Sequence, residues 1–142
     1  MRFDPNNTVI KLCSEGIEAE GFGHPDKARQ LYQQAWENSN TDFEKFTAAH
    51  YLARNQEDVN MELHWNLTAL QHATAIEQDS MKAYYPSLHL NIGKSYESLG
   101  NTNAALKFYQ SAADFIIYLP KDGYGNMIQS GITAALKRVN NV

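Results

Sequence analysis

The chain has only one cysteine, Cys13, among its 142 residues, so no disulfide bond can form within it. A lone thiol suits a reducing compartment, where disulfides are rare. The first ten residues lack the apolar run of a secretory signal, and no stretch approaches the ~20 apolar residues that a membrane span requires. We therefore expect a cytoplasmic protein that does not contact a membrane.

Basic residues are also scarce. The formal net charge is −4, and residues 55–81 carry five acidic side chains without a single lysine or arginine. General binding to nucleic acid needs a basic surface that neutralises phosphates. This charge distribution argues against a nucleic-acid partner.

Catalytic and metal-binding patterns are missing as well. No two of the five histidines have the i, i+4 spacing of a helical metal site, and His64 and His72 are eight residues apart. Cys13 has no nearby base that could activate it as a nucleophile. The carboxylates are scattered, and the glycine pairs in GFGH and DGYG do not follow a predicted strand. We expect no metal, no cofactor and no enzymatic activity.

What the chain does contain is helical periodicity, which is clearest in residues 86–119. Gly93 and Ala105 lie twelve residues apart, where small side chains let two helix backbones approach closely, and Tyr96 and Tyr109 flank them. Gly100 ends the first predicted helix. The second helix carries an apolar stripe that Pro120 is expected to end; the stripe is Ala105, Phe108, Tyr109, Ala112, Phe115, Ile116 and Leu119.

These residues resemble a tetratricopeptide repeat, a helix–turn–helix unit of about 34 residues that stacks on copies of itself. The resemblance implies a single all-α domain over residues 1–142 with about seven helices, arranged as three antiparallel pairs and a C-terminal capping helix. The repeats would span about 9–42, 43–78 and 86–119, and the capping helix about 123–140.

The earlier repeats follow the same plan with different fidelity. In the first, Gly16 and Ala28 are again twelve residues apart, and Pro25 occupies a natural first helical position. The second repeat is degenerate. Its sequence predicts one helix over 43–55, with Asp42 as the cap, and another over 64–76. Its spacing is about five residues longer than that of the first repeat, which a longer turn or a longer second helix would absorb. Pro86 then either kinks a long helix or follows a short turn.

The predicted capping helix has two distinct faces. Its apolar face consists of Met127, Ile128, Gly131, Ile132, Ala135, Leu136 and Val139. Its opposite face is polar and consists of Asn126, Gln129, Ser130, Thr133 and Lys137. A polar outer face is what a helix that closes a repeat array needs.

The resemblance also implies a concave groove, lined by the first helix of each repeat, that holds peptide segments. His50 and Arg54 lie one helical turn apart, and Asn91 and Lys94 are three apart in the last repeat. We predict that His50, Arg54, Asn91 and Lys94 bind carboxylate or carbonyl oxygens of a partner. The alternative is a solvated face on which the cations pair internally, for example with Glu20 and Glu97; the first repeat would add Cys13, Ile17 and Glu20 to the groove.

The best-known groove chemistry of this family is a carboxylate clamp for chaperone tails, which uses lysine and asparagine in the first helix. Cys13 and Ile17 occupy the matching positions here, so chaperone-tail binding is not implied.

Across nearly its whole length the chain resembles a small bacterial family of stand-alone repeat proteins. The resemblance rests on FEKFTAAHYLARNQ, Trp65, YYPSLHLNIGKSYE and LPKDGYG. Some members carry an rRNA adenine methyltransferase label. Such an enzyme needs a glycine-rich loop after a strand and an Asn-Leu/Ile-Pro-Tyr/Phe motif, and neither occurs in this sequence. We therefore predict no methyltransferase activity.

The sequence favours an adaptor that binds a protein or peptide partner and is a monomer or a weak homodimer. A second hypothesis is a small-ligand sensor with a polar pocket around His50 and Arg54, and an enzyme ranks third. The identity of the partner stays open.

Overall fold

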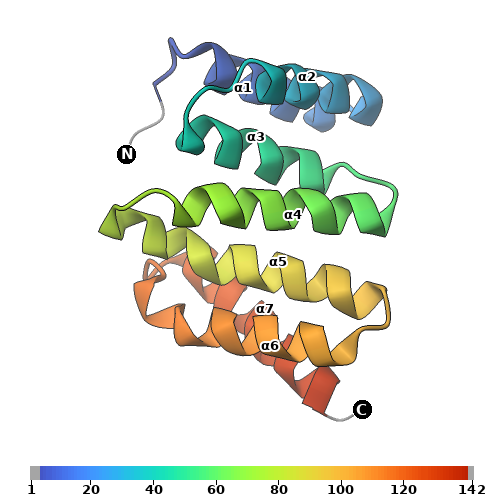
Figure 1. Ribbon diagram of the computed structural model, residues 1–142, viewed down its shortest axis with the longest axis vertical. Helices are drawn as coiled ribbons and strands as arrows, with labels where there is room; N and C mark the ends of the chain where they lie inside the picture. The colour runs from blue at the N-terminus through green and yellow to red at the C-terminus, as the bar shows by residue number, and fades with distance from the viewer. Residues whose placement is uncertain (1–3, 141–142) are drawn as a thin grey trace. The chain divides into compact units, whose positions relative to one another are not determined.

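The computed structural model describes residues 4–140, which form seven α-helices and two 3-10 helices without any strand in this range. The predicted all-α array of helical hairpins is confirmed. The chain divides into two compact units, Met1–Ile76 and Glu77–Val142 (Figure 1). The first contains α1 (Thr8–Gly21), α2 (Pro25–Glu37), α3 (Asp42–Arg54) and α4 (Val59–Thr74); the second contains η1 (Asp79–Tyr84), α5 (Tyr85–Ser98), α6 (Thr102–Asp114), η2 (Ile116–Tyr118) and α7 (Gly123–Asn140).

The α1–α2 hairpin forms as its turn residues predict. Asn7 caps α1 by accepting hydrogen bonds from the backbone N–H groups of Val9 and Ile10. Gly23 adopts a φ of +80°, a left-handed conformation that glycine tolerates best, and Pro25 then begins α2. Gly16 lies directly against the ring of Tyr32, because a Cβ at this position would stand 2.7 Å from Tyr32 Cδ1.

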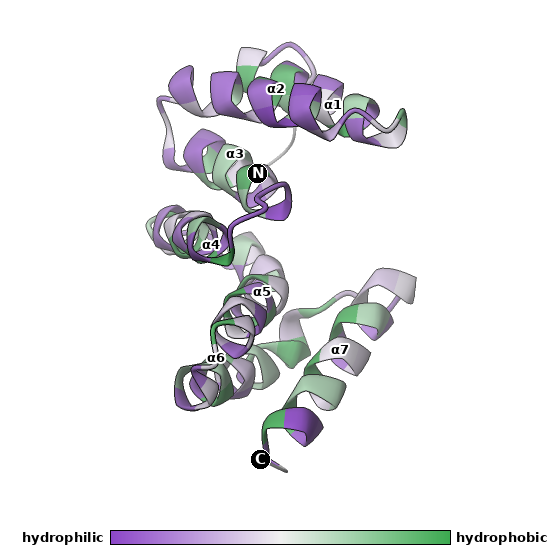
Figure 2. Cartoon of the chain, turned by 90° about the vertical axis from the view of Figure 1, so that its right-hand side faces the viewer, coloured by the Kyte–Doolittle hydropathy of each residue, from purple (hydrophilic) through white to green (hydrophobic). Residues whose placement is uncertain are grey.

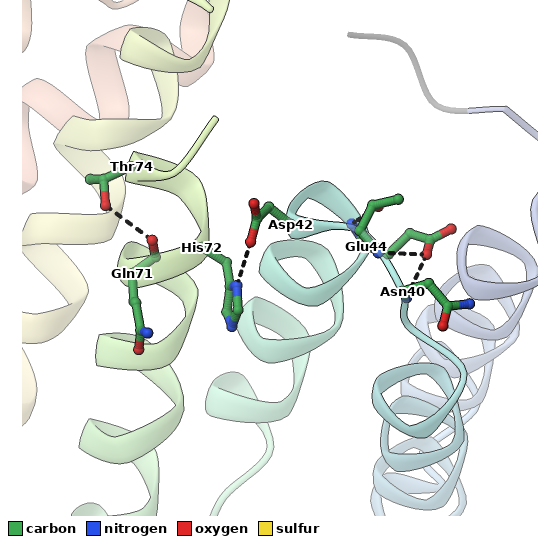
Figure 3. Close-up of polar contacts among 7 residues, drawn as sticks. Asn40, Asp42, Glu44, Gln71, His72 and Thr74 are labelled. Atoms are coloured by element: carbon green, nitrogen blue, oxygen red, sulfur yellow. Dashed lines mark hydrogen bonds and ion pairs between the residues drawn. The ribbon is translucent and has the colours of Figure 1, made fainter. Parts of the chain in front are cut away.

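The α3–α4 hairpin packs on the first one through α3. Thr41, and not Asp42 as predicted, caps α3: its hydroxyl accepts from the N–H of Glu44, whose carboxylate accepts from the N–H of Thr41 in return. Figure 3 shows Glu44 of this capping box, together with the hydrogen bond from the N–H of Asn40 to its carboxylate. The α4 helix begins at Val59, five residues before the predicted start, so a longer second helix absorbs the extra spacing.

Polar and aromatic contacts join α4 to the neighbouring helices. His72, in the last turn of α4, lies with its Nδ1 2.8 Å from Asp42 Oδ1 at the start of α3 (Figure 3). Trp36 of α2 meets Trp65 of α4 edge to face, with ring centroids 5.0 Å apart. Lys45 covers the ring of Trp36 at 4.5 Å. Trp36 thus extends the packing stripe of α2 onto the next hairpin.

In the second unit, the α5–α6 hairpin repeats the construction of the first hairpin. A Cβ at Gly93 would stand 2.5 Å from Tyr109 Cδ1, and Gly100 adopts a φ of +80° at the turn. Asn101 caps α6 by accepting from the N–H of Ala104. Pro86 is the second residue of α5, where its missing N–H is not needed, and the residues before it form η1. Pro86 therefore does not kink a longer helix.

The end of α6 differs from the prediction. The α-helix stops at Asp114, and Ile116–Tyr118 form the 3-10 helix η2 before Pro120. Leu119 is extended, with a ψ of 143°, as the residue before a proline prefers. The apolar stripe continues through this irregular segment, because Leu119 is buried and Ile116 packs against the same core.

The C-terminal helix α7 packs against α5 and α6 (Figure 2). Four of its buried residues belong to the core of the second unit, namely Ile128, Ile132, Ala135 and Val139. Met127 was predicted on this apolar face but is 61% exposed. The predicted position of Met127 was wrong, because the buried stripe of α7 includes Gly125 instead. At Gly125 the carbonyl oxygen of Pro120 leaves no room for a side chain.

Candidate functional site

The predicted site residue Arg54 is engaged within the first unit. Its Nη2 lies 2.8 Å from Glu20 Oε1, and Asn55 Nδ2 donates to the same oxygen at 2.9 Å. The hydroxyl of Tyr32 also donates to Glu20. Burial raises the pKa of the Glu20 carboxyl, but the hydrogen bonds from Arg54, Tyr32 and Asn55 outweigh it, so the net shift is downward. Glu20 is therefore ionised and holds Arg54 in place.

Arg54 nevertheless keeps capacity for another partner. Its side chain is 47% exposed, and it lies over the ring of Tyr51 at 4.9 Å. A guanidinium has five donors in a planar fork, and the ion pair with Glu20 occupies one side of it. The internal pairing that the sequence offered as an alternative is thus present, with part of Arg54 still open to solvent.

His50, one turn before Arg54, lies among aromatic rings. It meets Tyr51 edge to face at 5.2 Å between centroids and Phe46 at 6.5 Å. Burial, together with the positive charge of Arg54, lowers the pKa of His50 to about 4. His50 is therefore neutral at physiological pH and adds no charge to the site.

The second unit contains the same arrangement around Glu97. Tyr109 Oη donates to Glu97 at 2.6 Å, and Arg138 of α7 donates to its two oxygens through Nε and Nη2, both at 3.0 Å. The hydrogen bonds from Arg138 and then Tyr109 hold the pKa of Glu97 below its usual value. Each glutamate precedes its tyrosine by twelve residues. The bidentate ion pair between Arg138 and Glu97 fastens α7 to α5.

The predicted site residues Asn91 and Lys94 belong to α5. Lys94 is exposed, whereas Asn91 is partly buried and its backbone carbonyl accepts a hydrogen bond from Ser95. Lys94 is close enough to Glu97 for its charge to help lower the pKa of that carboxyl. His50 and Arg54 lie in the first unit, and Asn91 and Lys94 lie in the second. In each pair the first residue is partly buried and the second is exposed.

The first-repeat groove residues do not share one environment. Cys13 is only 3% exposed, and burial raises the pKa of its thiol to about 12. It is a packed apolar side chain and does not line an open surface, contrary to its predicted place in the groove. Ile17, one turn later, is 42% exposed.

The outer face of α7 forms a candidate binding surface. A hollow of about 520 Å³ lies along it, lined by Asn126, Gln129, Ser130, Thr133, Ala134 and Lys137. All six residues are exposed. We call this set the α7 polar face. Among the described residues, only Thr133 of these six side chains is engaged in a hydrogen bond, which its hydroxyl donates to the carbonyl of Gln129 at 3.0 Å.

Sequence reasoning identified the α7 polar face as the solvated side of a capping helix but did not recognise it as a possible site. The available signal was chemical: amide and hydroxyl side chains occupy positions where a merely solvated helix usually carries charges. The pairing of Arg54 with Glu20 was among the internal pairings that the sequence offered. The pairing of Glu97 with Arg138 was not foreseen, because it depends on how α7 packs against α5.

Among residues 4–140, no group of three or more histidine, cysteine, aspartate or glutamate side chains is arranged to hold a metal ion. None of the helices in this range has the length and apolar character of a membrane span. Comparison with known proteins finds no protein-family model and no curated protein that matches the chain.

Proposed function

We propose that this chain is a tetratricopeptide-like protein that serves as a cytoplasmic adaptor for a protein or peptide partner and is not an enzyme. Support for the repeat comes from the duplicated construction of the α1–α2 and α5–α6 hairpins. In both, a glycine lies against a tyrosine ring, and the same tyrosine donates to a glutamate that pairs with an arginine. Such hairpins bury their apolar faces by stacking on one another.

The α7 polar face is the observation that carries the binding function. It offers an open hollow lined by exposed amide and hydroxyl side chains. Small-molecule sites are usually lined by apolar and aromatic side chains that enclose the ligand. An exposed polar hollow on a rigid helix suits a segment of polypeptide better, because its main chain needs donors and acceptors along its length.

Lys94 is the contact residue that we favour among those predicted from the sequence, because it is exposed on α5. Asn91 lies three residues before Lys94 on the same helix and is the second candidate for a contact residue. In the first unit, the exposed part of Arg54 remains a proposed contact, and His50 would act as a neutral neighbour of it.

The small-ligand sensor stays a second hypothesis with less support. A ligand carboxylate at Arg54 would be limited to the side of the guanidinium that Glu20, at 2.8 Å from Nη2, leaves open. A neutral His50 would contribute no charge to offset that restriction.

The experiment that tests the adaptor function is selection of random peptides displayed on phage against the folded protein. We expect enriched peptides that bind the purified protein, as measured by fluorescence anisotropy of the labelled synthetic peptide. Lys94→Ala should weaken binding by about tenfold, which corresponds to about 1.4 kcal/mol. The matched control is Lys107→Ala on α6, another exposed lysine of the same unit. Failure to enrich any peptide that binds the folded protein would overturn the proposed function.

A further inference from the structure

We propose that the α7 polar face binds an extended peptide segment that carries an acidic side chain. The amide and hydroxyl groups of α7 would hydrogen-bond the peptide main chain, and Lys137 would bind the acidic carboxylate. This inference rests on the proposed function and adds to it the location of the site and the chemistry of the partner.

The length of the face suits an extended chain. From Asn126 to Lys137 the helix advances eleven residues, or about 16 Å at 1.5 Å per residue. An extended peptide covers that distance with about five residues at 3.3 Å each. Asn126, Ser130, Thr133 and Lys137 follow one another by three or four positions. Successive side chains are therefore about 5–6 Å apart and meet every second peptide residue.

The side chains also have suitable hydrogen-bonding groups. Each amide of Asn126 and Gln129 offers both donors and an acceptor, so it can pair with either a peptide N–H or a peptide carbonyl. The hydroxyl proton of Thr133 is already donated to the carbonyl of Gln129. Its oxygen therefore keeps acceptor capacity for a peptide N–H. Because these groups contact only the main chain, they tolerate many peptide sequences.

Charge decides where the acidic residue of the peptide lies. The last turn of α7 holds two cations, Lys137 and Arg138, but Arg138 is bound to both oxygens of Glu97. The α7 polar face contains no acidic side chain, so Lys137 is its uncompensated charge. An acidic residue placed at this end of the hollow would meet an open ammonium group.

The contacts between α5 and α7 indicate that Lys94 lies on the side of α5 that faces α7. A Cβ at Gly131 would lie 3.3 Å from Leu90 Cδ2, and Arg138 pairs with Glu97. The two residues of each pair are 41 positions apart in the sequence. Because this separation is constant, α5 and α7 run in the same direction. Lys94 lies on α5 between Leu90 and Glu97, about one turn from each. Exposed Lys94 therefore borders α7 outside the hollow, where an acidic segment that extends past Ala134 would meet a second cation.

The residues that flank the hollow support the same partner. Met127 and Ala134 each lie one turn before a residue that contacts α5, namely Gly131 and Arg138, so both are on the side of α7 toward α5. Ala134 lines the hollow on that side, and Met127 lies beside it. Met127 is 61% exposed and provides an adaptable apolar contact next to the polar groups. An apolar peptide side chain beside the acidic one would cover it.

The test uses the peptides selected from the phage library. The double variant Asn126→Ala, Gln129→Ala should weaken every selected peptide by about tenfold or more, whatever its sequence. Lys137→Ala should weaken only the peptides that contain Asp or Glu, and it should reduce the salt dependence of their binding. The matched control is Asn103→Ala, Gln110→Ala, which removes an exposed asparagine and an exposed glutamine from α6. It should leave binding unchanged.

A second measurement covers the case in which a variant alters the helix. A selected peptide that carries a photo-crosslinking residue is irradiated with the unmodified protein, and the adduct is located after trypsin digestion. We expect the adduct in the fragment 122–137. Selected peptides that bind equally well to the α7 variants, or that crosslink elsewhere, would overturn this inference and leave the adaptor function standing. Failure to select any peptide would overturn both.

Discussion

Gly93 faces the ring of Tyr109 so closely that a Cβ on Gly93 would stand 2.5 Å from Tyr109 Cδ1. Gly16 and Tyr32 have the same relationship in the first hairpin. Both tyrosines are fully buried, so neither ring can move away into solvent. Gly16 and Gly93 have ordinary helical backbone angles. Glycine is therefore required at these positions by packing and not by backbone conformation.

The first prediction concerns this contact. Gly93→Ala should lower the free energy of unfolding by about 1–3 kcal/mol, because the added methyl group overpacks a filled core, and the larger Gly93→Leu should lower it further. Chemical denaturation provides the measurement. The control is Gly21→Ala, where a Cβ would meet nothing within 4 Å; it should be neutral or stabilise by about 0.4–1 kcal/mol. Equal midpoints for Gly93→Ala and the parent protein would show that the assigned contact is wrong.

The second prediction is a loss of stability on mild acidification. Burial, with the charge of Arg54, lowers the pKa of folded His50 to about 4 from its usual 6.5. The unfolded chain therefore binds a proton below pH 6.5 that the folded chain refuses. The stability that neutral His50 contributes is complete above that value and falls as pH drops toward 4.

The free energy of unfolding should fall by about 1–2 kcal/mol between about pH 7 and pH 5. His50→Phe should reduce this pH dependence while keeping the ring contacts, and His89, whose pKa burial also lowers, should retain the remainder. His24→Gln at an exposed position is the control. A slope that His50→Phe leaves unchanged would contradict the assignment.

The third prediction concerns the bridge between α5 and α7. Because Arg138 and Tyr109 lower the pKa of Glu97, its stabilising effect is present above the usual carboxyl pKa and is lost as pH falls through the lowered value. Glu97→Gln should cost about 1 kcal/mol at neutral pH, a modest value because Arg138 is 49% exposed. The cost should shrink near pH 3. Urea denaturation at both pH values measures it, with exposed Glu18→Gln as the neutral comparison; a cost independent of pH would refute the role of the charge.

The fourth prediction is that the protein does not bind S-adenosylmethionine. The sequence lacks both motifs of an adenine methyltransferase, and residues 4–140 contain no strand from which a cofactor domain could be built. Isothermal titration calorimetry should show no heat above that of dilution. A micromolar dissociation constant would contradict this expectation and reopen the enzymatic hypothesis.

The helices and their pairing could be predicted from local signals. Periodic apolar positions, Pro25 at the start of α2 and Gly100 after the end of α5 indicated the first and last hairpins without knowledge of their packing. Element ends were less accurate where two local signals competed. Thr41 replaced Asp42 as the cap of α3 because Glu44 completes its capping box, and α6 ended before the stripe that extends to Leu119.

The all-α fold and the close approach at Gly93 follow from the order of side chains along the chain, because helical period and residue size depend on nothing else. Which polar groups remain open depends on how the helices pack. Arg54 and Arg138 are equally basic in sequence, but packing brings both against glutamates, while Lys137 stays uncompensated beside Arg138. The physical reason is that a charge's availability depends on the distance and burial of groups from other helices, which spacing along one helix does not specify.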